Sequence, residues 1–293
     1  MKKFYGTGVA LVTPFNQNLE VDYRGLKKLL NHTSKAVDYF VVMGTTGESV
    51  TVNGEEKNDI LKFVIKNNTR KLPVVFGIGG NSTENVIASI RQTDFSGVDG
   101  LLSVSPYYNK PSQEGIYQHF KAIADESPVP VILYNVPGRT GSNISADTTL
   151  RLANHKNIAG IKEASGNLEQ CMNIMKKKPK DFLLISGDDM VTVPLYSIGS
   201  KGVISVLANA FPGYFQKMKD YAFKNEFEKA SREQFKILEI NPLMYEEGNP
   251  VGVKYLLSRM GVCEDFTRLP MAPASESLKA RIGLIYQGIK RKG

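Results

Sequence analysis

Short runs of apolar residues recur along the chain and alternate with longer segments in which apolar residues follow a helical period. Each run is about five to six residues long, most are rich in Val, Ile or Leu, and their starts lie 20 to 34 residues apart. Because nearly every position in a run is apolar, the runs predict strands buried on both faces, as in a parallel sheet. They begin near Val9, Phe40, Val74, Leu101, Val131, Ala159, Leu183 and Val203.

The segments between these runs predict helices. Ile116, Phe120 and Ile123 follow the i, i+4, i+7 spacing of one helix face. Ser112 precedes them as a candidate N-cap. Further faces are marked by Ile60, Phe63 and Val64 and by Val86 and Ile90.

Eight alternations of strand and helix predict an α/β fold of the (β/α)8 TIM barrel type. A doubly wound sheet alternates in the same way, but it usually carries a Gly-rich loop after its first strand. Here the first strand runs into Thr13–Phe15, and Gly77–Asn81 lacks the third spaced glycine of such a loop. We therefore predict a barrel over residues 1–224 and a C-terminal helical extension over 225–293.

The extension has no convincing strand, and its apolar residues stand at helical spacings. It is too small to bury much apolar surface by itself, so we expect it to pack on the barrel. Its apolar positions include Phe227, Phe235, Ile237, Leu238, Ile240, Val253, Leu256, Leu257 and Met260.

Charge and composition exclude several classes of function. Lys and Arg number 37 and Asp and Glu 29, which gives a net charge of +8 and a pI near 9.2. The basic residues are spread along the chain without a stripe of interleaved aromatic residues, so we expect no nucleic-acid partner. No apolar run approaches the roughly 18 residues that a membrane span requires, so we expect no membrane partner.

The few metal-ligating residue types are scattered. Cys171 and Cys263 are too few for a disulfide framework or a four-cysteine zinc site. The histidines, His32, His119 and His155, show no ligand spacing. We predict no metal site and a cytoplasmic protein of a reducing compartment.

Barrel enzymes carry their chemistry at the C-terminal ends of the strands. In this chain those positions supply hydroxyl groups, one arginine and one lysine, without a histidine. The segments concerned are Gly44–Glu48, Pro106–Asn109, Tyr134–Gly141, Ile158–Ala164 and Gly187–Asp189.

Lys162 is the most informative of these residues. Strand parity places it on the same face as Gly160 and opposite Ile161. It is either paired with a carboxylate such as Glu163, or extended out of the barrel mouth, or a buried nucleophile. Burial favours a neutral amine, and a neutral amine can attack a ketone to form a Schiff base.

The neighbouring strand ends offer groups that suit this chemistry. Tyr134 occupies the equivalent height on the adjacent strand, where its phenol is either packing or a proton donor and acceptor. Thr45 and Thr46 lie in a Gly-bracketed turn that can offer N–H groups and hydroxyls to a carboxylate. Arg139 follows a Pro-Gly turn and is either a solvated loop residue or a planar partner for a second carboxylate.

Together these segments resemble the 4-hydroxy-tetrahydrodipicolinate synthase family, also called dihydrodipicolinate synthase, a family of the class I aldolase-type pyruvate lyases. The resemblance runs from Thr7 to Pro270. N-acetylneuraminate lyases and related sugar-acid aldolases share the barrel, the lysine and the tyrosine, and are the alternative. Arg139 and the Gly-Thr-Thr-Gly-Glu turn match the synthases, whereas the lyases typically have an apolar residue and a Gly-Ser-Thr-Gly-Glu turn. The segments that carry the resemblance are Gly44–Glu48, Tyr107-Tyr108, Tyr134–Gly141, Gly160–Glu163, Gly202–Val206, Asn249-Pro250 and Arg268–Pro270.

The resemblance implies a lyase that condenses pyruvate with L-aspartate 4-semialdehyde in lysine and diaminopimelate biosynthesis. It implies that Lys162 forms the Schiff base, that Tyr134 transfers protons, and that Thr45 links Tyr134 to Tyr108 of a neighbouring subunit. It further implies that no cofactor or metal is needed and that the enzyme is a homotetramer, a dimer of dimers. The substrate-binding positions that match are Thr46, Arg139, Gly187 and Ile204.

Members of this family that are inhibited by lysine bind it at a subunit interface. Gly54 and Lys57 replace residues that are commonly histidines in those members, and Asn85 replaces a glutamate. We therefore expect weak inhibition by lysine or none. The matching positions are Ser49, Val50, Gly54, Lys57, Gly79, Asn81, Asn85 and Tyr107.

Overall fold

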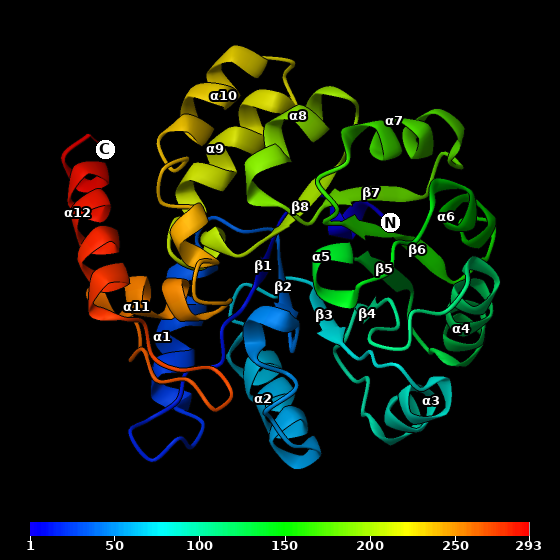
Figure 1. The fold of residues 1–293 in the computed structure, drawn as a ribbon, viewed down its shortest axis with the longest axis horizontal. Coiled ribbons are helices and arrows are strands. Elements are labelled where there is room, and N and C mark those ends of the chain that lie inside the picture. Colours follow the sequence, from blue (N-terminus) through cyan, green and yellow to red (C-terminus); the bar gives the residue numbers. More distant parts are fainter. Residues whose placement is uncertain (293) are drawn as a thin grey trace.

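The eight expected strands pair in sequence order into a closed parallel barrel, and the prediction of a (β/α)8 fold is confirmed (Figure 1). The computed structural model describes residues 1–292. Each strand overlaps the apolar run that predicts it. The strands are β1 (Gly6–Ala10), β2 (Tyr39–Val42), β3 (Val74–Gly77), β4 (Gly100–Val104), β5 (Val131–Asn135), β6 (Ile158–Glu163), β7 (Leu183–Ser186) and β8 (Gly202–Ser205).

Helices follow the strands and form the outer layer of the barrel (Figure 1). Ser112 caps α4 as expected, since its side chain accepts a hydrogen bond from the N–H of Gly115. The α-helices are α1 (Tyr23–Thr33), α2 (Gly54–Asn67), α3 (Thr83–Gln92), α4 (Gln113–Glu126), α5 (Pro137–Thr140), α6 (Ala146–Leu152), α7 (Leu168–Lys177), α8 (Thr192–Ser197), α9 (Pro212–Ala222), α10 (Phe227–Phe235), α11 (Val251–Arg259) and α12 (Glu276–Lys292). Single 3-10 turns lie at η1 (Lys2–Phe4), η2 (Thr45–Gly47), η3 (Asp189–Val191), η4 (Leu207–Asn209) and η5 (Pro242–Met244).

The barrel interior is filled with side chains from all eight strands. One buried apolar cluster contains Tyr39, Ile132, Tyr134 and Ile204, which come from three different strands. Phe4 of η1 packs edge-on against Tyr39, with ring centroids 5.9 Å apart, and is fully buried. The interior is therefore a packed core, and space for a ligand is confined to the rim.

The C-terminal extension is helical, as the spacing of its apolar residues predicts. Its helices α10, α11 and α12 follow the barrel, with α10 packed on α9 and α12 packed on α11 at the outer edge of the molecule (Figure 1). The boundary at residue 224 stays a prediction.

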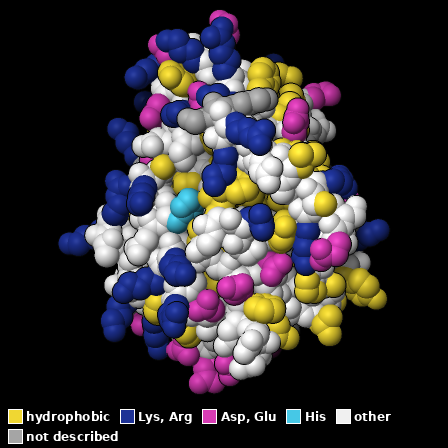
Figure 2. Space-filling view, turned by 90° about the vertical axis from the view of Figure 1, so that its left-hand side faces the viewer, with side chains coloured by type: hydrophobic (Ala, Val, Ile, Leu, Met, Phe, Trp, Pro, Cys, Tyr) yellow, Lys and Arg dark blue, Asp and Glu magenta, His cyan; other side chains and the backbone are white. Residues whose placement is uncertain are grey.

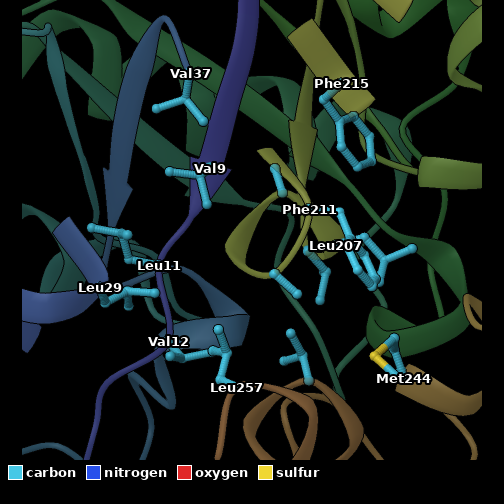
Figure 3. Close-up of a cluster of buried hydrophobic side chains, with 14 of the residues drawn as sticks. Val9, Leu11, Val12, Leu29, Val37, Leu207, Phe211, Phe215, Met244 and Leu257 are labelled. Carbon is cyan, nitrogen blue, oxygen red and sulfur yellow. The ribbon is translucent and has the colours of Figure 1, made fainter. Parts of the chain in front are cut away.

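One hydrophobic cluster joins the barrel to the extension. In it, Val9 and Val12 of the first strand and its exit share a buried core with Leu207, Met244 and Leu257 (Figure 3). The extension completes its core with residues of the barrel, as expected for a segment too small to bury a core alone.

The distribution of charged side chains and the state of the cysteines can be compared with what the composition predicts. Lysine and arginine side chains are spread over the face shown in Figure 2, with acidic side chains among them. Both cysteines, Cys171 and Cys263, are buried free thiols. None of the described helices is long and apolar enough to cross a membrane.

Candidate active site

The register of β5 against β6 brings Tyr134 and Lys162 side by side at the rim. The two residues are paired partners across the strands. The Nζ atom of Lys162 lies 4.1 Å from the centroid of the Tyr134 ring. Both side chains are buried, with Lys162 5% and Tyr134 6% exposed. The expected equivalence in height is confirmed.

Two glycines on or beside β6 stand where a side chain would collide with neighbouring groups. A Cβ atom on Gly187 would lie 3.0 Å from Cγ of Lys162, and one on Gly160 would lie 2.4 Å from the carbonyl oxygen of Leu183. A side chain at Gly187 would push Lys162 out of its place, and one at Gly160 would separate β6 from β7. Gly187 therefore lies directly beside Lys162, and its role in binding pyruvate stays a prediction.

Glu163, the carboxylate next to Lys162 in the sequence, points to the other face of β6. Its oxygens accept hydrogen bonds from Nδ2 of Asn135 at 3.0 and 3.1 Å, from Nε2 of Gln170 at 2.9 Å and from the N–H of Ser165 at 2.8 Å. No ion pair joins Lys162 to a carboxylate among residues 1–292. The alternative of a Lys162–Glu163 pair is therefore wrong, because strand parity separates the two side chains.

A cavity of about 600 Å³ opens at the rim beside Tyr134, whereas Lys162 is not among its lining residues. Thr45, Tyr134 and Arg139 contribute to its lining, so three of the predicted site residues meet there. Arg139 is exposed on the single-turn helix α5, which begins at Pro137 and replaces the expected turn. Among the described residues, the charged side chains of the lining are Arg139 and Lys57, both cations. This electrostatic setting suits an anionic ligand.

Five of the predicted catalytic and substrate-binding residues do not line this cavity, namely Lys162, Gly187, Ile204, Thr46 and Tyr108. Ile204 is buried in β8, where it pairs with Gly8 of β1. Thr46 is buried in η2, and its hydroxyl oxygen accepts a hydrogen bond from Nδ2 of Asn249 at 3.0 Å. Tyr108 is 88% exposed and does not line the cavity of its own chain.

The positions that match the lysine site of related enzymes lie around the outer end of the same cavity. Six of the eight line it, whereas Asn81 and Asn85 are exposed and do not. Burial lowers the pKa of Lys57. The lining members are Ser49, Val50, Gly54, Lys57, Gly79 and Tyr107.

A buried ion pair holds the Thr45–Gly47 turn to the C-terminal extension. Glu48 ends the turn in a left-handed conformation, with φ 54°, and its N–H donates to the carbonyl of Thr45 at 3.0 Å. Its carboxylate accepts from Nζ of Lys254 in α11 and from the N–H of Arg268 at 3.2 Å. Burial lowers the pKa of Lys254, and the Glu48 carboxylate opposes that shift.

Aromatic and charged neighbours surround this ion pair. The ring of Phe15 lies 4.2 Å from Nζ of Lys254 and 4.4 Å from Cζ of Arg268. Arg268 also pairs with Glu56 of α2. The sequence analysis assigns no role to the Glu48–Lys254 pair. The sequence feature that could have indicated it is Lys254 itself, a lysine among the apolar residues of α11.

These observations define a class of protein: a Schiff-base-forming enzyme built on a (β/α)8 barrel, with a buried lysine beside a phenol and a cationic mouth. The model of the dihydrodipicolinate synthetase family matches residues 3–287. The chain belongs to this family.

Named relatives and solved structures align with this chain over nearly its whole length. The 4-hydroxy-tetrahydrodipicolinate synthase of Cytophaga hutchinsonii is 53% identical over 293 residues, which is 100% of this chain and 99% of that protein. The synthase of Flavobacterium psychrophilum is 46% identical and covers 99% of this chain and 100% of its own. The structure of dihydrodipicolinate synthase from Thermotoga maritima has a TM-score of 0.95 at 36% identity, covering 98% of this chain and 99% of that one. A structure described as a monomeric dihydrodipicolinate synthase variant also has a TM-score of 0.95 at 36% identity, covering 98% and 97%.

The first prediction concerns the Glu48–Lys254 pair. Lys254→Met should lower the free energy of unfolding by about 3–5 kcal/mol, because it leaves a buried carboxylate without its cation. Urea unfolding measures this change. Adding Glu48→Gln to Lys254→Met should recover part of the loss, because the uncompensated charge is removed.

Lys279→Met is the matched control, since Lys279 pairs with Glu276 at the surface. It should change stability by less than about 1 kcal/mol. Equal losses in the two lysine variants would contradict the role of the buried pair.

Proposed function

We propose that this chain condenses pyruvate with L-aspartate 4-semialdehyde to form 4-hydroxy-tetrahydrodipicolinate through a Schiff base on Lys162. The observation that carries the proposal is a buried lysine at a barrel rim, beside a phenol and without a carboxylate partner among the described residues. Such an amine is free to act as a nucleophile. The reaction belongs to lysine and diaminopimelate biosynthesis.

The chemistry proceeds in three steps. First, the amine of Lys162 attacks the ketone of pyruvate and water leaves, which gives an imine. Loss of a proton from the methyl group then gives an enamine, whose carbon attacks the aldehyde and forms the new carbon–carbon bond. Finally, the amino group that comes from the semialdehyde attacks the imine carbon, which closes the ring and releases Lys162.

Tyr134 is the proton carrier in this scheme. Its ring lies against Nζ of Lys162, so its phenol is held in the immediate surroundings of the reacting nitrogen. A positioned proton donor and acceptor typically contributes about 10²–10⁴-fold in rate. No metal or cofactor is invoked, since the protonated imine on Lys162 accepts the electron pair.

The remaining site residues bind the two substrates. Thr46 and the backbone of Ile204 hold pyruvate against Gly187. Arg139 binds the carboxylate of the semialdehyde through its planar guanidinium, which pairs with two oxygens at once. This arginine, together with family membership, favours the synthase over N-acetylneuraminate cleavage.

Tyr108 supports a role for a neighbouring subunit. It is exposed and does not line the cavity of its own chain, which supports a role in another chain's site, where Thr45 would link it to Tyr134. We infer a homotetramer, a dimer of dimers. Because one structural neighbour is described as a monomeric variant, sedimentation of the wild-type protein is the decisive measurement. A cytoplasmic location also stays a prediction.

The second prediction tests the Schiff base. Borohydride added with pyruvate should inactivate the protein and attach one reduced pyruvate per chain at Lys162, because reduction fixes the imine as a stable amine. Intact-mass and peptide-mass measurements locate the label. Lys162→Arg should lose both label and activity, whereas Lys156→Arg, at an exposed lysine, should keep both. A label on any other lysine would exclude the mechanism.

The third prediction separates the two carboxylate sites. Arg139→Ala should raise the KM for the semialdehyde about ten- to a hundredfold, because it removes a charge-assisted pair. Borohydride trapping of pyruvate should change far less. Arg151→Ala, which removes an exposed arginine paired with Glu114, serves as the control. Equal losses in both measurements would mean that Arg139 is structural.

The fourth prediction concerns regulation by lysine. The cation of Lys57 opposes a ligand amine, and Asn85 lacks the charge of a glutamate, which lowers affinity about ten- to a hundredfold. A coupled assay with added L-lysine should therefore show full activity at tens of millimolar. Lys57→His combined with Asn85→Glu should increase inhibition. Half-inhibition of the wild type at submillimolar lysine would refute the prediction.

A further inference from the structure

Asp189 joins the exits of β7 and β8 through a buried carboxylate. It begins η3, which follows β7 after Gly187 and Asp188, and it is 4% exposed. Its Oδ2 atom accepts hydrogen bonds from the N–H of Val206 at 3.1 Å and of Leu207 at 2.9 Å. Its Oδ1 atom is buried and has no hydrogen-bond partner among the described residues.

These bonds lie where the strand ladder has ended. The register pairs of β7 with β8 end at Ser186 and Val203. Gly187 and Ile204, the two pyruvate-lining positions of these strands, are the next residues along each chain segment. Asp189 therefore ties the two segments together just beyond the positions that shape the pyruvate end of the pocket.

We propose that Asp189 is a positioning residue for pyruvate, and that its ionised form fixes the β8 exit in the geometry that binds this substrate. The proposal rests on the proposed function. Asp189 does not touch the reacting atoms; it acts through the backbone of Val206 and Leu207, and thereby through the adjacent Ile204. A carboxylate is the stronger acceptor for these two N–H groups, because a charged partner strengthens a hydrogen bond.

Burial of the Asp189 carboxylate disfavours its charged form. Burial raises the pKa of Asp189 to about 6, and the nearby charge of Asp188 adds to this shift. The N–H groups of Leu207 and Val206 and the nearby Ser205 hydroxyl oppose it. Tyr245 of the extension also faces both acids, and burial raises its pKa well above the usual value, with Asp189 and Asp188 adding to the shift. No lysine or arginine pairs with Asp189 among residues 1–292.

The sign of the pH effect follows from this direction. Because the folded-state pKa lies above the usual value, the group stabilises the fold at low pH and loses that contribution as the pH rises through about 6. The ionised form is thus present in the neutral range at the expense of stability. Perturbed groups of this kind cluster at functional sites.

The test compares pyruvate affinity in Asp189→Asn and wild type as a function of pH. The asparagine keeps the shape but cannot ionise. At about pH 8 the variant should bind pyruvate about tenfold more weakly, and the ratio should fall to less than about twofold near pH 5, as wild-type Asp189 protonates. Titrating groups that do not interact with Asp189 affect both proteins equally and cancel in the ratio. Thermal unfolding at about pH 8 should show the variant to be at least as stable as the wild type.

Asp22→Asn is the matched control. The carboxylate of Asp22 accepts from the N–H of Arg24 and Gly25 at the start of α1, remote from the pocket. Its affinity ratio should stay near one at every pH.

Three results would overturn the proposal. An Asp189→Asn ratio near one throughout would show no role in positioning. A loss that is independent of pH would show that the charge is irrelevant. If pyruvate affinity fell, the KM for the semialdehyde rose and thermal stability fell together, Asp189 would have a structural role only. Failure of wild-type trapping at Lys162 would instead refute the function itself.

Discussion

Closure of a parallel barrel is the constraint on which the rest of this structure depends. Eight strands that pair in one direction bring all their C-terminal ends to one rim, so residues far apart in the sequence meet there. Within that rim, the register of β5 against β6 decides the chemistry, because it pairs Tyr134 with Lys162. A shift by one residue would turn Lys162 to the outer face and bring Glu163 into the site.

The helical extension is part of the active-site architecture. Its apolar residues share a core with the first strand, and its Lys254 pairs with Glu48, 206 positions earlier in the chain. Glu48 in turn supports the Thr45 turn, and Asn249 bonds to the hydroxyl of Thr46. A hydroxyl-bearing turn at the rim is thereby held from two sides, by the barrel strand before it and by helices that come last in the sequence. Held in this way, the turn need not be ordered by the substrate.

Cationic and anionic side chains occupy different sides of the rim that carries Lys162 and Tyr134. The cavity mouth has cations at Arg139 and Lys57, whereas carboxylates lie behind the rim, in Glu163 and Asp189, where they bind backbone and side-chain N–H groups. The cations at the mouth suit carboxylate-bearing substrates. Among residues 1–292, Lys162 has no carboxylate partner.

The sequence by itself determined the barrel, the helical nature of the extension and the places of Lys162, Tyr134, Thr45 and Arg139 at the strand ends. The spacing of apolar residues and the alternation of side chains along a strand can be read from the sequence. In a closed barrel they indicate which residues lie at the rim. Only the tertiary structure decided the contacts that the spacing of apolar residues along the chain does not predict. The hydrogen-bond partners of Glu163, the pairing of Glu48 with Lys254 and the bonds of Asp189 to the β8 exit depend on which segments are brought together by packing. The sequence does not show which residue a charged side chain pairs with. The strength of a charge interaction depends on burial and distance, and these are defined only once the chain has folded.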